Sequence, residues 1–79
     1  SPVARMVSDA ANWLGDRGAD KAQGEAFLRA LIASNLSEIE CDPLIEALNA
    51  PGGYNQRLRL HMEANGISEA VRSGLDNLE

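Results

Sequence analysis

The chain holds one cysteine, Cys41, and one histidine, His61, so a thiol–imidazole pair is the nucleophilic arrangement its residues could offer. A reactive cysteine needs a base or a cation beside it, because the thiolate is the nucleophile. The sequence neighbours of Cys41 are instead the acids Glu40 and Asp42, and negative charge disfavours a thiolate. We therefore expect Cys41 to be a buried or half-buried structural thiol. His61 is expected at the surface or at the rim of its helix, and no residue is assigned a catalytic role.

A cluster of acids offers oxygen ligands to a divalent cation. Its members are Glu38, Glu40, Asp42 and Glu46. Their spacing lacks the alternating ligands, the central glycine and the terminal glutamate of a calcium-binding EF-hand loop. A single cysteine also excludes a multi-cysteine zinc site, and the glycines match neither phosphate-binding pattern. We expect a solvated acidic surface, with no metal and no cofactor.

The net charge is −5, from 12 acidic and 7 basic residues. This balance argues against binding to nucleic acid or to an anionic membrane, since both depend on basic residues. Residues 25–50, where a DNA-reading helical pair would lie, hold one arginine against five acids. No apolar run approaches the roughly 20 residues that cross a bilayer, and no charged segment followed by an apolar stretch marks a signal peptide. We therefore expect a cytoplasmic, intracellular protein. The absence of an initiator methionine suggests a domain excised from a larger protein.

The apolar residues recur at helical spacing over 79 residues that are 44% apolar and include no threonine. Ser1 and Pro2 predict the start of a first helix, which Gly15 ends. Asp20 and Gln23 predict a capping box for a second helix, which extends to about Ser34 and is expected to end with Asn35 in a left-handed conformation. Ser37 and Glu40 resemble another capping box, but Pro43 forbids a long helix there, so a short turn is expected over residues 37–41. This helix is apolar on most sides, which predicts a central position in the core.

The second half of the sequence predicts three shorter helices. Asp42 is expected to cap a third helix with Pro43 at its first position. Asn49 to Gly53 is a loop, and a fourth helix then runs from Tyr54 to the Asn65-Gly66 pair. Ser68 is expected to cap the last helix. The sequence thus predicts one all-α domain over residues 1–79, a compact bundle of about five short helices with the second helix central. Its core is expected to include Phe27, Leu31, Leu58 and Leu75.

Without catalytic residues, function is expected to reside in surfaces. The residues expected to bind a partner are Arg57, Arg59, Trp13, Glu38 and Glu40. Residues two apart on a helix point about 200° apart, so at least one of Arg57 and Arg59 should face solvent. The alternative is that both arginines pair with Glu63 or with the acids of residues 38–46. Trp13 is either an anchor for a partner or a partly buried cap of the core.

These expectations favour a non-enzymatic helical module that docks onto another protein or associates with itself. Opposite charges on one small helical unit suit head-to-tail association. The alternative function is that of an acidic regulator or inhibitor, which masks a basic site on a partner protein.

Overall fold

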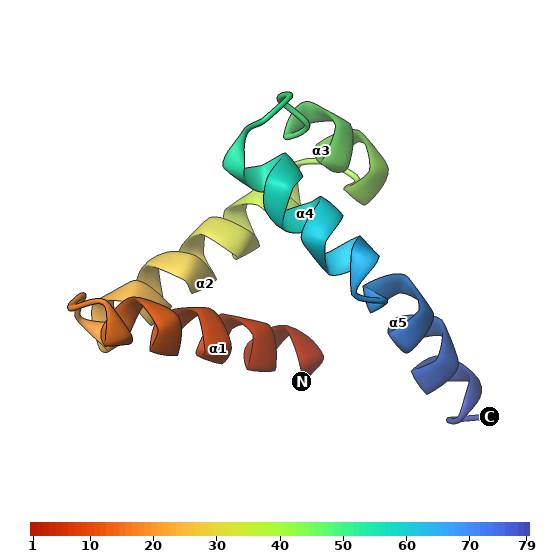
Figure 1. Cartoon of the computed structure of the whole chain (residues 1–79), viewed down its shortest axis with the longest axis horizontal. Coiled ribbons are helices and arrows are strands. Elements are labelled where there is room, and N and C mark those ends of the chain that lie inside the picture. Colours follow the sequence, from red (N-terminus) through yellow and green to blue (C-terminus); the bar gives the residue numbers. More distant parts are fainter. The chain divides into compact units, whose positions relative to one another are not determined.

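The computed structural model describes all 79 residues and contains five α-helices and no strand. The all-α class predicted from the helical spacing is confirmed. The helices are α1 (Pro2–Asp16), α2 (Lys21–Glu38), α3 (Cys41–Ala47), α4 (Tyr54–Ala64) and α5 (Ile67–Asp76) (Figure 1).

Three of the predicted helix boundaries are confirmed by their hydrogen bonds or backbone angles. The Ser1 hydroxyl accepts from the backbone N–H of Ala4 at 3.3 Å, and a carboxylate oxygen of Asp20 accepts from the N–H of Gln23 at 2.9 Å. Each side chain satisfies a donor that the first turn of a helix would otherwise leave unpaired. Gly66 takes a left-handed conformation with φ of 86°, which only glycine adopts without strain.

Two predicted caps are wrong. α3 begins at Cys41, so Asp42 lies within its first turn and caps nothing. Gly66 occupies the cap position of α5, and Ser68 lies inside that helix. In each case the helix begins directly before the residue that was expected to cap it, so that residue lies in the first turn.

α2 is four residues longer than predicted and ends at Glu38. The expected stop depended on Asn35 taking a left-handed conformation, but no residue other than glycine has a positive φ. Within the extension, the Ser37 hydroxyl donates to the backbone carbonyl of Ser34 at 2.9 Å. That bond satisfies the serine within the helix, so Ser37 does not act as a cap for a new one.

The chain divides into two compact units, Ser1–Cys41 and Asp42–Glu79. In the first unit, α1 and α2 form an antiparallel helical hairpin whose helices diverge from the loop that joins them (Figure 1). The helices approach most closely near this loop, where Gly24 lies against the side chain of Leu14. A glycine at this point allows the two backbones to come together.

The second unit contains nearly all of α3, together with α4 and α5. α3 and the start of α4 lie on either side of a hollow of about 180 Å³, lined by Leu44, Ile45, Leu48, Asn55 and Arg59. α4 contacts α5, which begins directly after the Gly66 turn. The single domain predicted from the chain length remains a prediction.

The residues expected to form the core are not the ones that are buried. Only Val7 and Ala11, both on α1, are buried. Phe27, Leu31, Leu58 and Leu75 were expected in the core, and all four are exposed. No residue of α2 is buried, so the expectation that neighbours cover it on most sides is wrong. Leu28 and Ile32 are half-buried, whereas Phe27, Leu31 and Leu36 are exposed. None of the five helices combines the length and the apolar character needed to cross a membrane.

Candidate interaction surfaces

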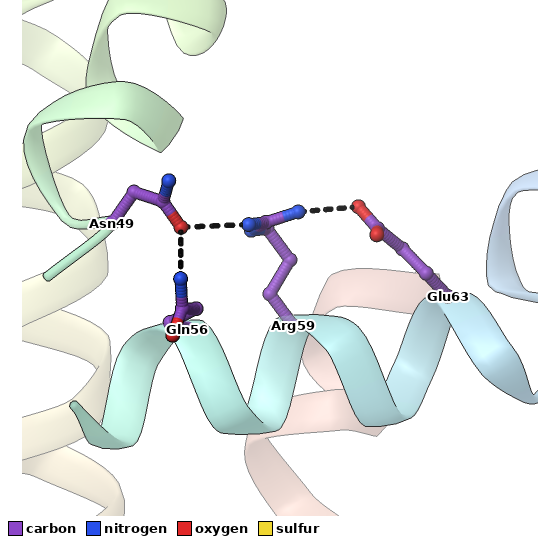
Figure 2. A network of polar contacts seen from close by, with 4 residues as sticks. All are labelled: Asn49, Gln56, Arg59 and Glu63. Atoms are coloured by element: carbon purple, nitrogen blue, oxygen red, sulfur yellow. Dashed lines mark hydrogen bonds and ion pairs between the residues drawn. The ribbon is translucent and has the colours of Figure 1, made fainter. Parts of the chain in front are cut away.

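Arg59 anchors the loop before α4. Its guanidinium donates to the Asn49 side-chain carbonyl at 2.8 Å and to a Glu63 carboxylate oxygen at 2.9 Å (Figure 2). Gln56 donates to the same Asn49 oxygen at 3.2 Å, and its own carbonyl accepts from the N–H of Gly52 at 2.8 Å. The arginine side chain is 30% exposed, which strengthens these charged hydrogen bonds relative to those at a fully solvated site. The guanidinium of Arg59 therefore forms its hydrogen bonds within the chain.

Arg57 is the freer of the two arginines. It is exposed and forms neither a side-chain hydrogen bond nor an ion pair. The expectation that at least one of the pair faces solvent is confirmed, and the alternative that both are used internally applies to Arg59 alone. The 200° offset along the helix explains the difference, because only one of the two positions can face Asn49. An unpaired guanidinium can bind a carboxylate of a partner through two parallel hydrogen bonds.

Trp13 is 54% exposed and lies beneath the guanidinium of Arg17, whose central carbon is 3.9 Å from the centroid of the indole ring. A cation over the face of a tryptophan is a favourable contact. It covers part of the ring and leaves the rest open to a partner. Sequence analysis did not identify this contact, although Trp13 and Arg17 are four residues apart and helical neighbours meet at that spacing.

The acidic candidates Glu38 and Glu40 lie at the end of α2 and just before α3, and both are exposed. Neither forms an ion pair. Trp13 lies near the hairpin loop, whereas Glu38 lies at the far end of α2, so the hairpin does not bring these two candidates together (Figure 1). No group of three or more histidine, cysteine or acidic residues is arranged to hold a metal ion.

Cys41 is exposed, which corrects the expectation of a buried or half-buried thiol. It occupies the first position of α3. His61 is exposed on α4, as expected for a surface residue. Its backbone carbonyl accepts from the Asn65 side chain at 2.8 Å.

A groove of about 340 Å³ lies between α1 and α2, where the hairpin opens. Its floor is apolar, and Glu25, Arg29 and Ser1 stand among the residues that line it. The apolar lining is Val3, Ala4, Val7, Ile32 and Ala33.

Comparison of the chain with protein-family models, with curated proteins and with solved structures finds no match.

Proposed function

We propose that this chain is a non-enzymatic helical module that binds another protein or a second copy of itself. The observation that carries the proposal is the exposure of large apolar side chains along its helices. More than half of each of the following side chains is accessible to solvent: Val3, Trp13, Phe27, Leu36, Tyr54, Leu58, Val71, Leu75 and Leu78. Where exposed apolar side chains gather into a patch, they mark a protein–protein interaction site.

The cost of exposing these side chains supports the proposal. Burial of a large apolar side chain contributes about 1.5–3 kcal/mol, and domains as small as this one are only marginally stable. A partner that covers several of the exposed residues would stabilise both the complex and the fold. Aromatic and arginine side chains such as Trp13 and Arg57 are the types that most often dominate such interfaces.

A second candidate function rests on charge. Of the 12 acidic residues, only Asp9 and Glu63 form ion pairs within the chain. The remaining carboxylates are available to a basic partner, which supports the alternative of an acidic regulator that masks a basic site. The two functions respond differently to salt, because screening weakens charge pairing and leaves apolar contacts intact.

The test begins with capture of binding proteins on the immobilised chain. Each captured protein is then purified and titrated against the free chain, and the chain is also titrated against itself. An interaction module binds at least one purified protein saturably and keeps most of its affinity between 50 and 500 mM salt, because apolar contacts supply most of the binding and Arg57 adds only a part. A masking protein loses most of its affinity over that range. If no purified protein binds saturably, the chain itself included, the proposal is wrong.

Charge contacts of the module are tested with two matched arginines. Arg57→Glu and Arg72→Glu make the same charge change at exposed arginines without ion pairs, on α4 and α5 respectively. If the predicted surface around Arg57 is used, the first substitution weakens binding at low salt and the second does not. Equal effects would show that net charge alone matters.

A further inference from the structure

The outer surface of α1 carries a second apolar stripe beside the one that contacts α2. The contact stripe contains the buried Val7 and Ala11, followed by the half-buried Leu14. The second stripe consists of Met6, Ala10 and Trp13, each one position earlier in the sequence. One residue corresponds to a rotation of about 100° around a helix. The second stripe therefore lies on one flank of the hairpin.

α2 repeats this arrangement. Its stripe toward α1 contains Gly24, Leu28 and Ile32, all half-buried. Phe27 and Leu31 each precede a member of that stripe by one position. Because α1 and α2 are antiparallel, the same offset along both chains turns the side chains to the same flank of the hairpin. Met6, Ala10, Trp13, Phe27 and Leu31 thus form one surface, which we call the hairpin face.

The groove confirms that the opposite flank is different. Its lining includes Ala4, Glu25, Arg29 and Ala33, each one position after a residue of the contact stripes or of the groove floor. A later position rotates the side chain the other way. The charged pair Glu25 and Arg29 therefore lies on the groove flank. The stripes themselves contain no charged residue, but the guanidinium of Arg17 lies over Trp13 near the hairpin loop. Met6, Trp13, Phe27 and Leu31 are between 44% and 65% exposed.

We propose that the hairpin face binds the hairpin face of a second copy of this chain, forming a two-fold symmetric dimer in which the four α1 and α2 helices pack in two layers. This inference rests on the proposed function and names the partner. A two-helix layer has one face that only a second layer can bury, and four-helix bundles are the stable solution for paired hairpins.

Area and charge favour a second copy. Four large side chains of about 150–250 Å² each, roughly half exposed, offer about 300–500 Å² per chain. Two copies together bury about 600–1,000 Å², which is the size of a weak, reversible interface. The charged group at this face is Arg17, whose guanidinium lies over Trp13 near the hairpin loop. A two-fold axis that runs across the helices places the two Arg17 side chains at opposite ends of the dimer, so they do not repel each other.

Sedimentation equilibrium of the purified chain over 1–200 µM tests the dimer directly. We expect a reversible monomer–dimer equilibrium that is unchanged or strengthened by salt, because the net charge of −5 opposes association. A monomer at every concentration would overturn the inference. An open series of larger oligomers would also overturn it, because a two-fold interface closes. If the monomer nevertheless binds another purified protein, the proposed function survives and only this inference fails.

Two matched leucines of α2 test the face. Leu31 lies on the hairpin face, whereas Leu36 belongs neither to that face nor to the residues that line the groove, and they are 44% and 52% exposed. Leu31→Glu should raise the dimer Kd at least tenfold, whereas Leu36→Glu should leave it within about twofold. Equal effects would overturn the assignment of the face. Circular dichroism of each variant at low concentration shows whether the helices persist.

The single tryptophan provides a test that needs no variant, so it holds even if Leu31→Glu fails to fold. Trp13 lies in the hairpin face, so dimerisation must shield it. We expect quenching of its fluorescence by acrylamide to fall as concentration passes through the Kd measured by sedimentation. A dimer in which quenching of Trp13 is unchanged would use another surface and would overturn the inference.

Discussion

Arg59 and Arg57 show how two identical side chains on one helix take different roles. Arg59 connects Asn49 to Glu63, and it thereby holds the loop that precedes α4. The side chain of Arg57 forms no hydrogen bond and no ion pair within the chain. The sequence alone predicted that the two would diverge, from the angle between positions two apart. It did not show which would be internal, because that depends on where the loop residue Asn49 lies.

Replacement of these arginines should separate their roles. Arg59→Met is expected to lower the free energy of unfolding by about 1 kcal/mol, since it removes two charged hydrogen bonds at a half-buried site. Arg57→Met should change it by less than about 0.5 kcal/mol, as is usual for an exposed residue. Urea titrations followed by circular dichroism measure both. A larger loss at Arg57 would contradict the network of Figure 2.

Two aspartates give a second contrast at this scale. Asp20→Ala should cost about 0.5–2 kcal/mol, because the carboxylate caps the start of α2. Asp42→Ala should have a smaller effect, since Asp42 accepts no hydrogen bond and lies inside the first turn of α3. Thermal denaturation of both variants decides the matter. A similar loss for Asp42 would restore the cap expected from the sequence.

At the scale of elements, local sequence was sufficient wherever a helix boundary depends on neighbouring residues. Ser1, Asp20 and Gly66 act as predicted, because caps and left-handed turns require contacts only three or four positions away. The end of α2 was missed for a related reason. Asparagine and serine favour helix caps, but Asn35 and Ser37 can also lie inside a helix when their side chains find hydrogen-bond partners there. Their presence therefore does not require the helix to end.

Gly66 at the N-terminal cap of α5 and Gly74 within that helix should respond in opposite directions to replacement by alanine. Gly66→Ala is expected to destabilise the fold by about 1 kcal/mol or more, because its φ of 86° strains any residue with a Cβ. Gly74→Ala should stabilise it by about 0.5–1 kcal/mol, since Gly74 lies within the helix and a Cβ there meets no neighbouring atom. Thermal unfolding distinguishes the two. A stabilising Gly66→Ala would contradict the left-handed turn.

For the whole molecule, the sequence did not reveal which apolar residues are buried. α2 has apolar residues all around, so its pattern does not indicate a single contact face, and the burial of each side chain depends on distant helices. Leu31 was expected to be essential to a core, yet it is exposed. Leu31→Ala should therefore cost less than the 2–5 kcal/mol typical of a buried leucine.

Two neighbouring alanines test where the core of the hairpin lies. Ala11 is fully buried, so Ala11→Leu should lower the free energy of unfolding by about 1–3 kcal/mol through overcrowding. Ala10→Leu places the same side chain on the exposed hairpin face and should be tolerated. Unfolding is measured at low concentration, where the monomer dominates. If Ala11→Leu is also tolerated, α1 and α2 do not meet along the Val7–Ala11 stripe.

The close approach of Gly24 to Leu14 has a consequence for natural variation at these two positions. A methyl group at position 24 would lie 3.2 Å from Leu14 Cδ1, so the leucine would have to shift by a few tenths of an ångström. The residues accepted at position 24 during evolution should therefore depend on the residue at position 14. Chains that descend from a common ancestor with this one are expected to keep glycine at position 24 while position 14 is large, and to accept alanine there when position 14 has become smaller. Alanine at position 24 would therefore follow a smaller residue at position 14, and it would be disfavoured without that change.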